Sequence, residues 1–326
     1  MKLELVKKYE PDNIEAHYGC VALSEETTVS LVMDKEDKYC LLLLSPNQMR
    51  ILPLNYLEKF TKIPHYPVLF AKEGGFGIIK NENELLYYPT IDSIPIEISI
   101  ENKEIFQQAL KIPQFENVWP PKIKLGYPNP ISNNDVLPVC FEHTYFHNNP
   151  RYFACLNLNM KEQKAKWENW TNLDAEKFPV HGSRYDNFPP RIDSIMIKDK
   201  DVFIYTSGIG ASYCKGMYYY GIVRTTKKGE IVETLLDSGD LTIIDQKKRG
   251  VNGVFTSSQK YAILTPVFQN DEWKGKQKLF SIETKELIAI EFPRGSGKYP
   301  RVMQESGKYF WVYLWDTRHF AICREK

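Results

Sequence analysis

Hydrophobic and polar residues alternate with a period of two along residues 189–237, and this stretch predicts four consecutive β-strands. The alternating runs cover residues 192–197, 202–205, 217–223 and 231–236. Successive side chains of a strand point to opposite faces, so this alternation is typical of strands with one buried face. Gly229 lies between the last two runs and can supply the positive φ of a tight turn. The stretch therefore predicts a four-stranded antiparallel meander.

The same pattern of short alternating runs recurs along most of the chain. Further runs lie within residues 19–54, 66–88, 119–170, 254–292 and 301–323. Several units open with a proline step, as at Tyr66-Pro67, Pro120-Pro121, Pro189-Pro190 and Tyr299-Pro300. Proline is tolerated there because the start of a strand does not need its N–H for the ladder. The recurrence predicts an architecture built from copies of one unit.

This repetition resembles the β-propeller superfamily over nearly the whole chain, without the signature of a particular family. The resemblance implies an all-β fold, a single β-propeller domain over residues 1–326. We expect about six four-stranded blades, with five or seven also open. The strand at residues 2–10 has no partner nearby in the sequence, so it is expected to pair with the C-terminal blade and close the ring.

One helix is expected to interrupt the strands. Ile105, Phe106, Ala109 and Leu110 have helical spacing, and Asn102 is suited to cap the N-terminus of such a helix. These residues predict a short helical insertion near residues 102–111.

A second architecture fits the same pattern of strands. Two β-sandwiches joined near residues 172–177 would also have short strands, with a turn about every 8 to 12 residues. Repeat signatures do not decide between the two, because Gly74-Gly75 is the only glycine doublet and Trp315-Asp316 the only Trp-Asp pair. The sequence therefore does not resemble kelch or WD repeat proteins.

Composition and charge narrow the classes of function. The chain has 326 residues, of which 43% are hydrophobic and 25% charged, as in ordinary globular proteins. Its net charge of +1 gives no long-range field for nucleic acid or anionic lipid. No apolar run approaches the roughly 20 residues that span a bilayer, and the first residues do not form a signal peptide. We expect a cytoplasmic protein that binds neither nucleic acid nor membrane.

No motif gives a strong catalytic or metal-binding signal. The six cysteines are scattered through apolar sequence without a CxxC pair, which predicts reduced core residues. Residues 295–298 read Gly-Ser-Gly-Lys but lack the rest of a P-loop, and they predict a loop between blades. His143 and His147 could join His181 at a zinc ion, although their polar surroundings favour surface histidines. No cofactor and no metal are expected.

The strongest candidate site is the segment 181–188, which contains His181, Arg184, Tyr185 and Asp186 directly before a predicted inner strand. In a propeller, loops that lead into inner strands surround the mouth of the central channel. Groups from several blades would therefore meet there.

Three basic residues would join that mouth from other blades. Lys122, Arg191 and Arg301 each follow a proline step, so they would face one another across the axis. Such a basic ring suits an anionic ligand or an acidic partner. The alternative is that each arginine pairs with a carboxylate of a neighbouring blade.

Aromatic residues form a second candidate surface. Trp119 would join Trp167, Trp170, Phe178 and the tyrosines at 218–220. Aromatic residues with arginine are what protein interfaces concentrate, while packing between blades is the alternative for any one of them.

The function that these features favour is a non-enzymatic protein-binding β-propeller, such as an immunity or inhibitor protein that occludes a toxin or enzyme. This follows from the scaffold and from the absence of a reaction motif, and is an analogy of fold. The alternative is a hydrolase or lyase acting on an anionic substrate at the channel mouth, with His181 or Asp186 transferring the proton. A structural subunit of a larger assembly is a third possibility.

Overall fold

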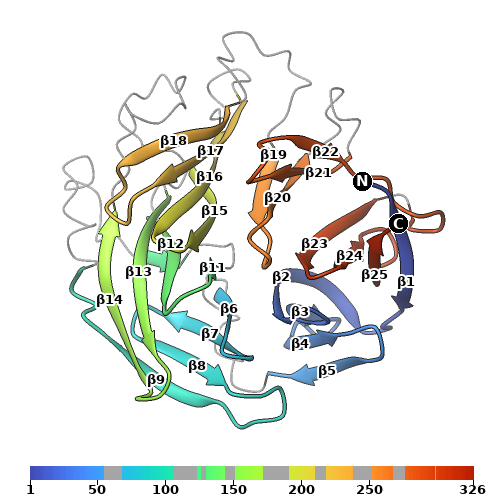
Figure 1. Cartoon of the computed structure of the whole chain (residues 1–326). Coiled ribbons are helices and arrows are strands. Elements are labelled where there is room, and N and C mark those ends of the chain that lie inside the picture. The colour runs from blue at the N-terminus through green and yellow to red at the C-terminus, as the bar shows by residue number, and fades with distance from the viewer. Residues whose placement is uncertain are drawn as a thin grey trace.

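The computed structural model describes residues 1–54, 68–105, 123–125, 130–143, 151–171, 191–209, 218–237, 251–266, 276–297 and 299–326. The named elements in these ranges are all β-strands, which confirms the all-β prediction. They form five hydrogen-bonded sheets. The sheets surround a common centre in a propeller-like arrangement (Figure 1).

The strands of each sheet follow one another in the chain with few exceptions. The first sheet contains β2 (Ile14–Ser24), β3 (Thr27–Asp34), β4 (Tyr39–Leu44) and β5 (Met49–Pro53). The second contains β6 (Val68–Lys72), β7 (Gly75–Asn81), β8 (Glu84–Tyr88), β9 (Ile96–Glu101), β10 (Ile123–Leu125), β12 (Val136–His143), β13 (Arg151–Asn159) and β14 (Lys164–Thr171). The third contains β11 (Ile131–Ser132), β15 (Arg191–Lys198), β16 (Asp201–Ile209), β17 (Tyr218–Thr225) and β18 (Ile231–Asp237). The fourth contains β19 (Val251–Phe255), β20 (Tyr261–Pro266), β21 (Lys278–Ser281) and β22 (Leu287–Ala289), and the fifth β23 (Pro300–Ser306), β24 (Tyr309–Leu314), β25 (His319–Glu325) and β1 (Leu3–Tyr9).

The prediction of six separate four-stranded blades is corrected by the eight-stranded sheet. Strand β9 pairs with β14 in parallel, Ala165 opposite Ile100, and this pairing joins two four-stranded runs into one sheet. Strand β9 was not predicted, and without it the two runs would remain apart. The third sheet also differs, since β11 adds a fifth strand in parallel to β15.

The two ends of the chain share one sheet. Strand β1 pairs antiparallel with β25, with Leu3 opposite Glu325 and Tyr9 opposite Phe320, as predicted for the N-terminal strand. The two termini lie side by side in Figure 1. Two separate sandwiches divided near residues 172–177 would keep the chain ends in different domains, so this pairing argues against that alternative.

The apolar core lies between neighbouring sheets. Trp311 of β24 and Leu42 of β4 belong to one buried cluster between the fifth and first sheets. Tyr205 of β16 and Phe255 of β19 belong to another, between the third and fourth. Face-to-face burial of successive sheets explains why both faces of many strands are apolar, as in the fully buried Tyr309–Leu314 of β24.

The predicted helix near residues 102–111 lies mostly outside the described residues, which end at Ile105 in this part of the chain. Asn102 is described and has a φ of 60°, which is not the extended conformation of an N-cap residue. Its side-chain amide donates to the carbonyl oxygen of Trp167 at 2.8 Å. Asn102, which was expected to cap a helix, therefore connects the end of β9 to β14. Nowhere in the described ranges is a helix long and apolar enough to cross a membrane.

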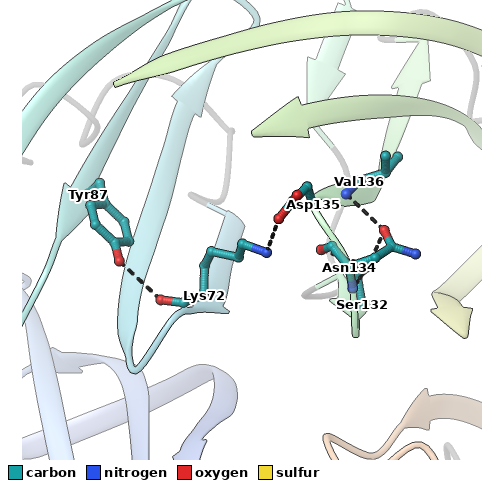
Figure 2. A network of polar contacts seen from close by, with 6 residues as sticks. All are labelled: Lys72, Tyr87, Ser132, Asn134, Asp135 and Val136. Carbon is teal, nitrogen blue, oxygen red and sulfur yellow. Dashed lines mark hydrogen bonds and ion pairs between the residues drawn. The ribbon is translucent and has the colours of Figure 1, made fainter. Parts of the chain in front are cut away.

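Polar contacts connect turns and strand ends that are far apart in the sequence. Figure 2 shows one of them, in which the Lys72 ammonium lies 2.5 Å from the Asp135 carboxylate while Tyr87 donates to the Lys72 carbonyl. Asn134 in turn donates to the carbonyl of Asp199 at 2.8 Å.

Similar contacts join the third, fourth and fifth sheets. Gln259 donates to the carbonyl of Ile197 at 3.0 Å, and the Ser257 N–H donates to Gln304 at 2.6 Å. Buried polar groups that are satisfied in this way fix the position of each sheet relative to the next.

Candidate functional site

Arg301 is the one predicted site residue whose side chain the structure describes. Trp119, Lys122, His181, Arg184, Tyr185 and Asp186 lie outside the described residues, and for Arg191 only the backbone is described. Arg191 and Arg301 do occupy corresponding positions, because β15 begins at Arg191 and β23 begins one residue before Arg301. The basic ring therefore stays a prediction. Arg301 is the candidate residue whose surroundings are known.

The Arg301 side chain lies against an exposed tryptophan. In the β23–β24 hairpin Arg301 is opposite Tyr313, and the Arg301 Cζ atom lies 5.4 Å from the ring centroid of Trp315. Trp315 directly follows β24 and is 59% exposed. A guanidinium over an indole ring is a favourable cation–π contact. The hairpin thus presents a cation and a large aromatic surface together.

The aromatic contacts extend from Trp315 into the protein. Tyr313 meets Trp315 edge to face, with ring centroids 5.8 Å apart, and His17 of β2 stacks on Tyr313 at 5.6 Å. We call Arg301, Trp315, Tyr313 and His17 the aromatic row. It crosses from the fifth sheet to the first, so the position of Trp315 depends on the packing of two sheets.

Arg301 has no partner of opposite charge in the part of the chain that the structure describes. Its side chain is half-buried, and burial alone lowers the pKa of Arg301. A guanidinium that has lost part of its hydration without a carboxylate nearby is in an unfavourable environment. A bound anion would supply the missing interaction.

His17 is held in its neutral form. Its Nε2 atom is shielded from solvent and has no hydrogen-bond partner among the described residues, and burial lowers the pKa of His17 to about 4. Glu15, two residues before it, is ion-paired with Arg318. Burial raises the pKa of Tyr313, so its hydroxyl also stays neutral at pH 7. The aromatic row therefore carries a single charge at neutral pH, that of Arg301.

A buried carboxyl group lies toward the other end of β23. Glu305 is 2% exposed and accepts a hydrogen bond from the Ser258 hydroxyl. Burial raises the pKa of Glu305, and this effect is opposed by hydrogen bonds from Ser258 and Thr256 and by the charge of Lys260. Because it is buried and hydrogen-bonded to Ser258, Glu305 is a structural group that connects the fourth and fifth sheets.

Glu305→Gln is expected to change how stability depends on pH. Because the folded-state pKa of Glu305 is raised, the wild-type protein loses stability as the pH rises from the ordinary glutamate pKa of about 4.3 through the folded-state value. Glu305→Gln lacks this loss. The free energy of unfolding of the variant, relative to that of the wild type, should therefore increase as the pH rises across this window. Urea unfolding at several pH values measures the difference, and a constant difference would contradict a buried, titrating Glu305.

The other candidates from the sequence have structural roles where they are described. Trp167 is fully buried in an apolar cluster and donates from its indole to the carbonyl of Glu82 at 2.8 Å, so it is a core residue. Cys20, Cys40, Cys140, Cys155 and Cys323 are buried thiols outside any disulfide, as predicted, while Cys214 lies outside the described residues. Gly295 and Gly297 have positive φ in the connection between β22 and β23, the loop that was predicted there.

The histidine pair does not form a described metal site. His147 and His181 lie outside the described residues, and of His143 only the backbone is described. Among the side chains that the structure does place, no group of three or more histidine, cysteine, aspartate or glutamate residues could hold a metal ion.

The sequence did not point to Trp315, Tyr313 or His17 as site residues. Trp315 could have been found, because in a hairpin the residue after the second strand lies beside the start of the first, where Arg301 was already a candidate. His17 could not, since its contact with Tyr313 joins two sheets that are far apart in the sequence.

Comparison with known proteins gives similarities of fold only. The sequence matches no protein-family model and no curated protein. A chain of the mitotic checkpoint complex aligns with a TM-score of 0.45 and 9% identity, covering 98% of this chain and 91% of that chain. The β-propeller domain of Nup133 from Vanderwaltozyma polyspora aligns with a TM-score of 0.41 and 10% identity, covering 99% and 100%. A polysaccharide lyase bound to an ulvan fragment aligns with a TM-score of 0.45 and 10% identity, covering 94% and 80%.

The class of this protein follows from its own geometry. Five sheets around a common centre, with the chain ends paired in one of them, define an all-β, propeller-like protein. Its described candidate site is a half-buried arginine on an exposed tryptophan.

Proposed function

We propose that this chain is a non-enzymatic, cytoplasmic protein-binding propeller, and that it acts as an immunity or inhibitor protein by covering the active site of a toxin or enzyme. In this proposal the pairing of β1 with β25 closes the arrangement of sheets, so that the face carrying the aromatic row is rigid. A rigid face binds a partner without a large loss of conformational entropy.

The observation that carries the proposal is the pairing of Arg301 with Trp315. Tryptophan and arginine are the residues that most often dominate the binding energy of protein interfaces. Trp315 is 59% exposed and Tyr299 is 41% exposed. The Trp315 N–H donates to the Tyr299 carbonyl, which keeps these two aromatic residues together. An exposed aromatic pair next to an uncompensated cation has the composition of an interface centre.

The alternative, a hydrolase or lyase acting on an anionic substrate, is less well supported by the described residues. A catalytic acid or base works best when its pKa lies near the operating pH. The pKa of His17 is about 4 and that of Tyr313 is raised by burial, so neither is adjusted for proton transfer at neutral pH. His181 and Asp186, which the enzyme hypothesis uses, lie outside the described residues.

The proposal is tested by affinity purification from the native host with the tagged protein as bait, followed by mass spectrometry. We expect one stoichiometric partner with the wild type. Trp315→Ala should weaken its binding by about 30-fold or more, as for an interface residue that contributes about 2 kcal/mol. Ile94→Ala is the matched control, because Ile94 is 83% exposed and lies between β8 and β9 on another sheet.

Two results would contradict the proposal. One is recovery of no partner together with a small molecule retained in the purified protein, which would favour the enzyme. The other is an equal loss of partner from the Trp315 and Ile94 variants.

A further inference from the structure

We propose that the Arg301–Trp315 pair receives a carboxylate, and that the partner therefore presents an aspartate or glutamate side chain at the centre of the interface. This inference rests on the proposed protein-binding function and specifies the chemistry of the partner. It concerns the half-buried guanidinium of Arg301, which lies against the indole of Trp315.

Arg301 has no ion pair within the described residues, whereas the described arginines of similar burial do. Among the described arginines with half-buried side chains, Arg50 is paired with Asp92 and Arg224 with Asp201 and Glu233. Arg301 is half-buried like these two, yet neither an ion pair nor a hydrogen bond to its guanidinium exists within the described residues. The two other described arginines of this burial are each paired with a carboxylate, so Arg301 has an open position for one.

The acidic residues closest in sequence to His17 and Trp315 have other contacts. Glu15 is bound to Arg318. Asp316 follows Trp315, and its carboxylate lies against Gly297, in the loop before β23, so closely that a side chain on Gly297 would overlap it. Burial is the single cause of the lowered pKa of Arg301, so no described acidic side chain stabilises its charge. In this proposal a bound partner supplies that carboxylate.

A carboxylate of a protein fits this position better than a free ion. The planar guanidinium presents N–H donors in a fork that matches both oxygens of a carboxylate. The exposed indole beside it, at 5.4 Å from the Arg301 Cζ atom, is an apolar surface for the carbon atoms next to that carboxylate. An acidic side chain flanked by apolar residues satisfies both parts of the pair at once.

The test uses random 12-residue peptides displayed on phage as the probe, selected against the full-length protein. Three proteins are compared: wild type, Arg301→Gln and the control Arg50→Gln. The control removes an arginine of the first sheet that is paired with Asp92, between β8 and β9. We expect wild type and Arg50→Gln to enrich peptides that carry aspartate or glutamate beside an apolar residue, and Arg301→Gln to lose that enrichment.

A selected peptide then measures the interaction directly. Replacing its acidic residue by the amide should weaken binding to the wild type by about 10-fold to 100-fold and leave binding to Arg301→Gln unchanged. Arg301→Lys keeps the charge without the fork and should give an intermediate affinity. Thermal unfolding of each variant verifies that it is folded.

The outcomes separate this inference from the proposed function. Enriched peptides without acidic residues, or equal acidic enrichment on Arg301→Gln, would overturn the carboxylate site and leave a protein-binding face. If the wild type enriches no peptide and the host yields no partner, the protein-binding function fails as well.

Discussion

Gly253→Ala is expected to lower the free energy of unfolding by about 3 kcal/mol, because the added methyl group has no space between two sheets. A Cβ atom at Gly253 of β19 would overlap three atoms of the Tyr205 ring on β16. That ring is fully buried, and its hydroxyl donates to the carbonyl of Val251 at 2.5 Å, so it cannot move aside without losing a buried hydrogen bond. Glycine is required here by the close approach of the third and fourth sheets.

Chemical denaturation of Gly253→Ala and Asn252→Ala measures this effect. Asn252 is the neighbouring residue of β19 and is exposed, so its truncation should change the free energy of unfolding by less than about 0.5 kcal/mol. Adding Tyr205→Leu to Gly253→Ala should cost less than the sum of the two single changes, since the smaller side chain makes room for the methyl group. Equal stabilities of the two alanine variants would mean that the sheets do not pack as described.

His17→Phe is expected to remove a loss of about 3 kcal/mol in the free energy of unfolding, which the wild type undergoes between about pH 6.5 and pH 4. Burial lowers the folded-state pKa of His17 from 6.5 to about 4, so the unfolded chain binds the proton first as the pH falls. The wild type therefore loses stability on acidification through this window. Phenylalanine keeps a ring against Tyr313 and Phe320, and it removes the ring nitrogen that has no described partner.

The measurement is the free energy of unfolding at intervals from pH 4 to pH 8, carried out in a Glu305→Gln background. That background is needed because Glu305 titrates in an overlapping range with the opposite sign. At pH 8 the His17 variant should be as stable as its parent or more stable, and its advantage should grow as the pH falls. An unchanged slope in His17→Phe would show that His17 is hydrated in the folded protein.

Most of the strands could be predicted because their sequence alternates locally. The run Ile96-Glu97-Ile98-Ser99-Ile100-Glu101 alternates as regularly as any other, and β9 could have been found from it. Its parallel pairing with β14 could not, because it joins segments about 65 residues apart and depends on how two sheets meet. The prediction of about six separate four-stranded blades was therefore wrong, although the strands were largely right.

The candidate site was predictable to the extent that it depends on one hairpin. Arg301 was identified from the proline step before it, and Trp315 lies beside it because antiparallel pairing places the two ends of a hairpin together. The contact of Tyr313 with His17 and the absence of a described carboxylate near Arg301 are properties of the assembled fold. These properties turn a basic residue into a candidate binding site.

Site-specific photo-cross-linking tests the central claim, that the partner binds at the Arg301–Trp315 face. A benzophenone side chain is introduced in the host at Tyr299, beside Trp315, or at Ile94 on the other sheet. The account predicts one discrete cross-linked protein with the probe at Tyr299 and none with the probe at Ile94. A partner that cross-links from Ile94 and not from Tyr299 would contradict it.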